Sequence, residues 1–184
     1  MSIDHIDAGQ LSDRVEILRL VRDDGGCHWE AVRRSWARPE LQQRRNNFST
    51  HGIGAAGVEF TIRRQRMELE NAIRWGRQHC FLTGIAPRGR NHLTVMAALV
   101  EISPCLDPET GLAFPGIVTE KYLGHQQEDP MAVNTLRHVL VTPKCVVLKP
   151  GHLAEVEGVL WPVRTAHLLD PAKNEYEIER EVEL

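Results

Sequence analysis

Short stretches in which apolar and polar residues alternate, separated by turn residues, run through most of this chain. The clearest are VEFTIR at 58–63 and YEIEREVEL at 176–184. A period of two places successive side chains on opposite faces of a strand, so each stretch predicts a strand with one buried face. No segment in residues 11–102 has a helical stripe. We therefore expect a mainly β protein, with further strands at 14–20, 29–37, 79–83, 93–97, 139–142 and 159–164.

The spacing of these strands predicts a small antiparallel β-barrel over residues 11–102, preceded by an N-terminal arm at 1–10. Residues 103–135 contain four of the ten prolines and little periodicity, which indicates a linker or an inserted arm. Additional C-terminal β-strands are expected at 136–184. The predicted fold is thus a barrel with an extension that is itself β-rich.

The first two strands are expected to form a hairpin around the glycine-containing turn at 22–26. Pro39 is expected to end the second strand, because proline lacks the N–H that a sheet ladder uses. Residues 40–57 are polar and then glycine-rich, and they predict a long loop, with a short helix near Leu41 as an alternative within it. Long ordered loops are often functional.

Residues 58–102 and 138–184 show the same order of features: a strand, a turn, a glycine, a strand, a turn with asparagine and a strand. Gly76 and Gly158 are 82 residues apart, and Asn91 and Asn174 are 83 residues apart. This fits an internal repeat that gives one and a half barrels per chain, or the general rhythm of a β meander. In the second case the C-terminal strands extend or cap the sheet of one barrel.

Charge is distributed unevenly along the 184 residues. Residues 1–93 carry 15 arginines against 11 acidic side chains, whereas residues 94–184 carry 7 basic against 14 acidic ones. Halves of opposite charge suit head-to-tail contacts between copies, and a mixed solvated surface is the alternative. The start of the chain lacks a secretory signal, no apolar run approaches membrane-spanning length, and four cysteines without CxxC spacing indicate reduced thiols. These features predict a soluble intracellular product.

No motif supports an enzyme. GIGAAG at 52–57 matches the GxGxxG dinucleotide pattern, but it follows a polar loop and precedes a strand, the reverse of the context that a phosphate site needs. Cys27-His28 and His79-Cys80 offer two thiolates and two imidazoles. Neighbouring residues on a strand point to opposite faces, which disfavours a joint zinc site. We expect no catalytic residue, no metal and no cofactor.

Several segments occur in an order that resembles the head-tail joining proteins of tailed bacteriophages, also called head-closure or stopper proteins. They are LSDRVEI at 11–17, DDGG at 23–26, Trp29, Trp36-Ala37 and VEFTIR at 58–63. That family shows an L-x-x-R-V-x-I strand, a G-x-x-x-x-W hairpin, a W-A strand, V-x-F-x-I-R and then a glycine before x-Y-x-I. Here Gly76 and HCFL at 79–82 take the last place, without the tyrosine. The resemblance covers residues 11–102, and the remainder exceeds the usual length of a single barrel.

The resemblance implies a structural virion protein of the phage neck, a head-tail connector that forms an oligomeric ring and retains packaged DNA until ejection. The implied partners are further copies in a ring of six or twelve, portal or adaptor proteins on the head side, and a tail terminator or tail tube on the tail side. Packaged DNA would be contacted nonspecifically. The protein is expected in the virion neck, after assembly in the host cytoplasm. With a true repeat, six chains would present twelve barrel-like units.

By the same resemblance, the loop at residues 41–57 faces the channel. Its polar residues would meet DNA phosphates, and its glycines would let it move between closed and open positions. An ordinary surface loop is the alternative. The candidates are Arg44, Arg45, Asn46, Asn47, Gly52, Gly54 and Gly57.

Two other functions stay open. The arginine pairs suit a small-barrel nucleic-acid-binding module, which the acidic C-terminal half and an aromatic content of 5% oppose. Another neck component, such as a tail terminator, is the second alternative.

Overall fold

The structure, a computed structural model, describes residues 8–46, 48–121 and 135–181, and these residues are mainly β-strand. The prediction of a mainly β protein is confirmed. Within the described part of the chain, no helix has both the length and the apolar character needed to cross a membrane. After a 3-10 turn, η1 (Ala8–Gln10), the strands are β1 (Asp13–Asp23), β2 (Gly26–Asn46), β3 (Ala55–Arg63), β4 (Ala72–Trp75), β5 (Gln78–Arg88), β6 (His92–Val100), β7 (Ser103–Asp107), β8 (Leu112–Glu120), β9 (Thr135–Pro143), β10 (Leu153–Val156), β11 (Val159–His167) and β12 (Lys173–Glu181).

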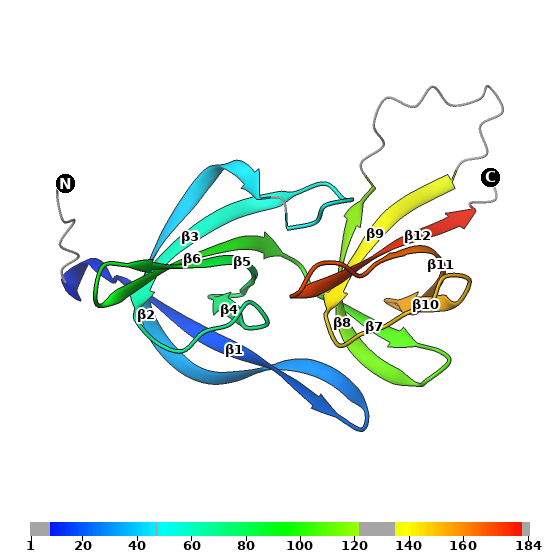
Figure 1. Cartoon of the computed structure of the whole chain (residues 1–184), viewed down its shortest axis with the longest axis horizontal. Helices are drawn as coiled ribbons and strands as arrows, with labels where there is room; N and C mark the ends of the chain where they lie inside the picture. Colours follow the sequence, from blue (N-terminus) through cyan, green and yellow to red (C-terminus); the bar gives the residue numbers. More distant parts are fainter. Residues whose placement is uncertain (1–7, 47, 122–134, 182–184) are drawn as a thin grey trace. The chain divides into compact units, whose positions relative to one another are not determined.

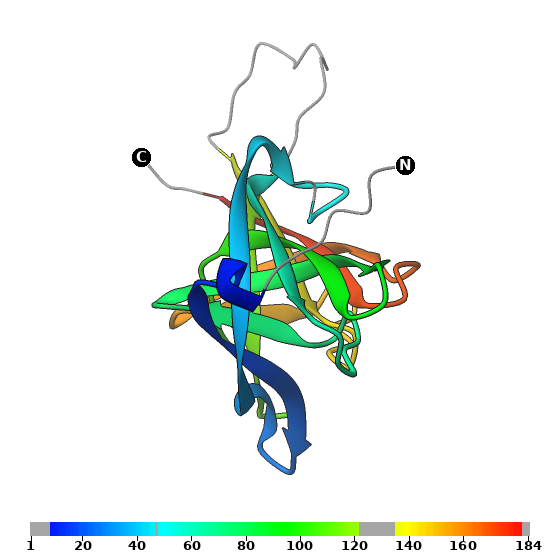
Figure 2. The same ribbon diagram turned by 90° about the vertical axis from the view of Figure 1, so that its left-hand side faces the viewer.

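The first six strands pair in the order β1-β4-β5-β6-β3-β2, and a further pairing of β1 with β2 closes this order into a ring. The pairings of β4 with β1 and β5, of β6 with β5 and β3, and of β3 with β2 are antiparallel. Figures 1 and 2 show β1 and β2 as a long hairpin. A ring of this kind leaves no strand of the six at a free edge.

The last six strands pair in the order β7-β10-β11-β12-β9-β8, and β7 also pairs with β8. All of these pairings are antiparallel. Replacing each strand of the first ring by the strand six places later gives this same order. The chain therefore contains the same strand arrangement twice.

The positions of two turn glycines agree with this duplication. Gly76, with a φ of 61°, joins β4 to β5, and Gly158, with a φ of 78°, joins β10 to β11. Both connections are two residues long, and such hairpins need positive φ values that glycine adopts without strain. The two glycines that are 82 residues apart in the sequence thus lie in the turns of equivalent hairpins.

The prediction of a linker or inserted arm at 103–135 is wrong for the described part of this segment, because residues 103–107 and 112–120 form β7 and β8. The prolines suggested irregular structure there. In the structure, Pro104 lies directly opposite Pro115 in the β7–β8 ladder. Antiparallel ladders contain pairs that exchange no N–H···O bonds, and proline costs no ladder bond at such a pair.

The prediction of a long loop at 40–57 is also wrong for most of this segment. Strand β2 continues through Pro39, which lies opposite Phe60, to Asn46, and β3 already begins at Ala55. Leu41 pairs with Val58 and is in no helix. A proline removes one donor only, and a strand continues past it where the ladder does not use that donor.

The chain divides into two compact units. The first runs up to Val21 and includes Trp29–Phe48 and Gly54–Glu101; the second includes Arg22–His28, Ser49–Ile53 and the chain from Ile102 onward. The first unit has a core of inward-facing residues from its strands: Val15, Ile17, Ala37, Val58, Phe60, Ile62, Ile73, Cys80, Leu82, Leu93, Val95 and Ala97.

The second unit has its own buried residues, among which Tyr176 is the largest that is fully buried. Its hydroxyl donates to the carbonyl of Val146 at 2.8 Å and accepts from the N–H of Leu148 at 3.1 Å. This pair of bonds holds the connection between β9 and β10 against β12. The buried phenol therefore has both its donor and an acceptor position in use.

Candidate functional site

The residues predicted to face DNA do not form one loop. Arg44, Arg45 and Asn46 belong to β2 and Gly57 to β3, where Gly57 pairs with Gln42. The side chain of Arg44 is exposed, next to an irregularity in the β2–β3 register. For Arg45 and Asn46 the structure describes the backbone, and Asn47 lies outside the described residues.

Gly52 and Gly54 do lie in the connection between β2 and β3. None of Gly52, Gly54 and Gly57 has a positive φ. A Cβ atom on Gly52 would lie 2.2 Å from Cγ2 of Thr119. At Gly52 the missing side chain therefore permits close packing, and the movement expected of these glycines stays a prediction.

Residues Ser49–Ile53, here called the strap, belong to the second unit. The N–H of Ile53 donates to the carbonyl of Glu120 at 3.0 Å, and the hydroxyl of Thr119 donates to the carbonyl of Ile53 at 2.7 Å. Gly52 also forms an isolated antiparallel bridge with Lys121. The strap is thus fixed along the end of β8.

Glu175 holds the other end of the strap. Its side chain is 3% exposed and accepts hydrogen bonds from Oγ of Ser49 at 2.8 Å, the N–H of Thr50 at 3.0 Å and the N–H of His51 at 3.2 Å. The ammonium of Lys173 lies 2.5 Å away. Burial raises the pKa of Glu175, but the bonds from Lys173, Thr50 and Ser49 outweigh burial and leave the pKa below its ordinary value. The ionised carboxylate is the form that suits four donors.

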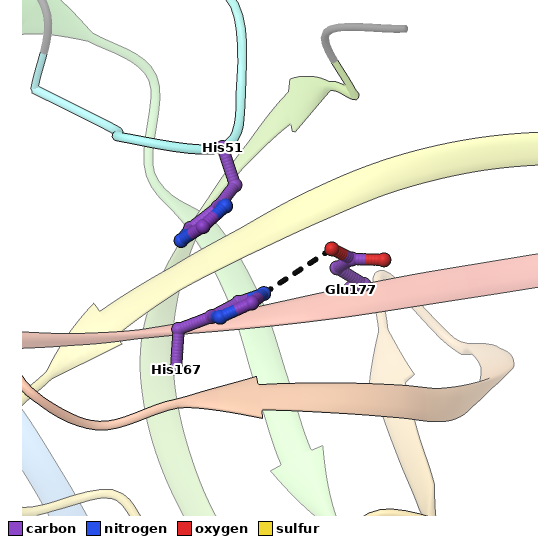
Figure 3. A group of neighbouring side chains, drawn as sticks. All are labelled: His51, His167 and Glu177. Carbon is purple, nitrogen blue, oxygen red and sulfur yellow. Dashed lines mark hydrogen bonds and ion pairs between the residues drawn. The ribbon is translucent and has the colours of Figure 1, made fainter. Parts of the chain in front are cut away.

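The anchored strap places the His51 ring over the His167 ring. The ring centroids are 3.6 Å apart and the planes are inclined by 14°. Nε2 of His167 lies 3.2 Å from Oε1 of Glu177 (Figure 3). Each of these three partly buried residues offers one atom that could bind a metal ion, and the three atoms lie within 4.8 Å of one another.

Strand register explains why His167 meets Glu177. In the β11–β12 ladder His167 lies opposite Glu175, and Glu177 is two residues further along β12. Opposed residues and their neighbours at a spacing of two share a face of the sheet. His167, Glu175 and Glu177 therefore point to the same side, while Tyr176 between the two glutamates points to the other side.

Lys121, which directly follows β8, contacts the same glutamate. Its ammonium lies 2.5 Å from Oε2 of Glu177. Burial raises the pKa of Glu177, but the hydrogen bonds from Lys121 and His167 outweigh it, so the pKa lies below its ordinary value. Glu177 is therefore a carboxylate with one oxygen on Lys121 and the other beside His167. We call His51, His167 and Glu177 the His-Glu cluster.

The cysteine–histidine pairs named in the sequence go to different units. Cys27 belongs to the second unit, where Cys145 interacts with it, and burial, with Cys145 adding to it, raises the pKa of the Cys27 thiol to about 12. His79 belongs to the first unit and packs on Trp29, with ring centroids 4.6 Å apart. Burial, with a smaller contribution from Arg74, lowers the pKa of His79 to about 4, so this imidazole is neutral at pH 7.

Comparison with known proteins relates the chain to none of them: no protein-family model, no curated protein and no solved structure matches it. Its function is therefore inferred from its residues and its fold.

Proposed function

We propose that this chain is a non-enzymatic structural protein of a tailed-bacteriophage neck, which forms a ring between head and tail and helps to retain packaged DNA until ejection. The ordered segments between residues 11 and 102 that resemble head-tail joining proteins support this role. The observation that carries it furthest is the duplicated strand order of β1–β6 and β7–β12. A closed unit of six strands suits a subunit whose task is assembly.

We infer that each ring of strands is a small antiparallel β-barrel. In the first unit, the buried residues alternate along the strands and meet in one cluster that includes Val15, Phe60 and Val95. Closure removes unpaired strand edges, which otherwise pair with other chains without control. Copies of such a unit would associate through side-chain surfaces, which permits the defined contacts of a ring.

Two barrels per chain would double the number of barrel units relative to the number of chains in a ring. Six chains would present twelve barrels, and such a ring would match a twelve-fold neighbour on one side and a six-fold neighbour on the other. Heterologous contacts close into a ring when the rotation between subunits fits. The excess of arginine in residues 1–93 and of acidic residues in 94–184 provides surfaces of opposite charge for such contacts.

The nucleic-acid-binding alternative is weakened by the partners of the arginines. Of the arginines that suggest such a module, Arg34 pairs with Glu16, and Arg88 lies 3.8 Å from Glu59. Guanidinium groups already paired with carboxylates contribute less to the release of counterions from DNA, which supplies most nonspecific affinity. DNA contact is therefore proposed as a secondary property of an assembled ring.

The test is electron cryo-microscopy of particles of the virus that encodes the chain, together with quantitative mass spectrometry of the purified particles. We expect a ring of this chain between portal and tail, with six copies per particle. A twelve-copy ring would overturn the symmetry argument alone. A ring at the end of the tail tube would favour the terminator, and absence of the chain from purified particles would overturn the neck role altogether.

A deletion provides the matching functional readout. Particles assembled without the chain should fill their heads and then lose DNA, so that their DNA becomes sensitive to nuclease. Complementation with the full chain should restore protection. Protected, infectious particles without the chain would contradict a role in DNA retention.

A further inference from the structure

We propose that the His-Glu cluster is a binding site for a divalent transition-metal ion, with Zn²⁺ as the ion that fits its donors best. Two imidazoles and one carboxylate form a donor set found in zinc sites that keep a fourth position open. In this chain the donors are His51 from the strap, His167 from the end of β11 and Glu177 from β12. The proposal is independent of the neck role.

The spacing of the donors is close to what the ion requires. Tetrahedral Zn²⁺ at roughly 2.0–2.1 Å from nitrogen and oxygen places neighbouring ligand atoms about 3.4 Å apart. The ligand atoms of the cluster already lie within 4.8 Å of one another. Binding therefore needs side-chain rotation without a rearrangement of strands.

The two imidazole rings make the principal adjustment. They are stacked, with an interplanar angle of 14°, so their in-plane lone pairs run side by side and do not meet. Nε2 of His167 already lies 3.2 Å from Oε1 of Glu177 (Figure 3), so the larger rotation is that of the His51 ring, which would bring one of its nitrogens to an ion held by these two atoms. All three side chains are partly exposed, which leaves room for this rotation and for a water as the fourth ligand.

The surroundings hold the donors in place. Glu175 accepts the N–H of His51, and this bond fixes the backbone from which the imidazole extends. Lys121 binds Oε2 of Glu177, while Oε1 faces Nε2 of His167, and an ion would replace the hydrogen bond between these two atoms. Hydrogen bonds of this kind to the ligands of a metal orient them and raise affinity.

A second histidine–glutamate pair in the same unit offers a matched control. Nδ1 of His152 lies 2.5 Å from Oε1 of Glu109, and both side chains are partly exposed. Within the described part of the chain, the His-Glu cluster is the group in which three potential ligands come together. His152→Ala therefore removes a histidine–carboxylate pair without touching the proposed site.

The experiment is calorimetric titration of the full chain with Zn²⁺, after treatment with a chelator and its removal. We expect one ion per chain, and at least about a tenfold loss of affinity in His51→Ala, His167→Ala and Glu177→Gln, compared with unchanged affinity in His152→Ala. Titration with Co²⁺ should produce the intense visible absorption of a four-coordinate ion, and this absorption should disappear in His51→Ala.

Circular dichroism establishes whether each variant is folded. His51 lies in the strap, outside the strands, so His51→Ala keeps the test valid if a variant in β11 or β12 fails to fold. Absence of saturable binding would overturn the proposal. So would equal loss of affinity in His152→Ala, or full affinity in a folded His51→Ala; the cluster would then be a histidine stack with an ion pair and no more.

Discussion

Replacing Glu175 with glutamine should release the strap. The substitution keeps the size of the side chain and one carbonyl acceptor, but it removes the charge that Lys173 faces. The two side chains are 3% and 9% exposed. Removing one partner of a buried ion pair costs about 3–5 kcal/mol. For a chain of this length, that corresponds to a fall in Tm of roughly 6–20 °C.

The local effect can be separated from the global one by hydrogen exchange. The N–H groups of Thr50 and His51 donate to Glu175. A loss of about 3 kcal/mol corresponds to exchange that is faster by a factor of about 100. The N–H of Arg64, which donates to Asn91 in the first unit, is a reference that should change only with global stability.

A double variant separates the effect of the buried charge on stability from the effect of releasing the strap. Lys173→Met combined with Glu175→Gln replaces both members of the buried ion pair, so most of the unfolding free energy should return. An unfolding free energy within about 1 kcal/mol of the parent for Glu175→Gln alone, with Thr50 and His51 still protected, would refute the reasoning.

Acid should weaken the parent protein through the same carboxylates. Glu175 and Glu177 have folded-state pKa values below their ordinary value of 4.5. Between the lowered and the ordinary pKa the unfolded chain binds more protons, so stability rises with pH there and is lost as pH falls through the lowered values. Urea denaturation as a function of pH should give a shallower acid limb for Glu175→Gln, and an identical limb would contradict this assignment.

Three further substitutions or reactions test other parts of the structure. Phe60→Ala removes a fully buried ring and should cost about 3–5 kcal/mol in urea denaturation. Gly52→Ala should cost about 1–3 kcal/mol in thermal unfolding, and adding Thr119→Ser should restore part of it, because serine lacks the methyl group that the new Cβ meets. An alkylating reagent at pH 8 should modify the half-buried Cys145 before Cys27, whose buried thiol has a pKa of about 12, as peptide mass spectrometry would show.

Strands with a strict alternation could be predicted from the sequence because one face of each is buried. VEFTIR at 58–63 lies within β3, with Val58, Phe60 and Ile62 in the core. Strands β4 and β10 were not predicted, because four residues each are too few to show a period. Their existence depends on the partners on either side of them, β1 and β5 for β4 and β7 and β11 for β10.

Proline caused the larger errors. Pro39 suggested the end of β2, and Pro104 and Pro115 suggested a linker, yet all three lie inside strands. Whether a proline breaks a strand depends on whether its missing N–H would have met an acceptor, and only the register decides this. The sequence does not contain the register in any local pattern.

The His-Glu cluster could not be predicted, because its members come from three separate segments. One signal was present: the strand at 173–181 has charged residues at 173, 175, 177 and 179. Two of these, Lys173 and Glu175, are buried, so the polar side of β12 is itself covered. Which segment covers it follows from the position of the strap, and no pattern around Ser49 indicates that.

The bond between Ser49 and Glu175 joins residues that are 126 positions apart in the chain. A ribosome adds about 5–20 residues per second, so Ser49 is made about 6–25 s before the residue that anchors it. During that interval strands β3–β6 complete the first ring, and the N–H groups of Thr50 and His51 do not yet have Glu175 as their acceptor. Strand β12 thus anchors a segment that is synthesised 126 residues earlier.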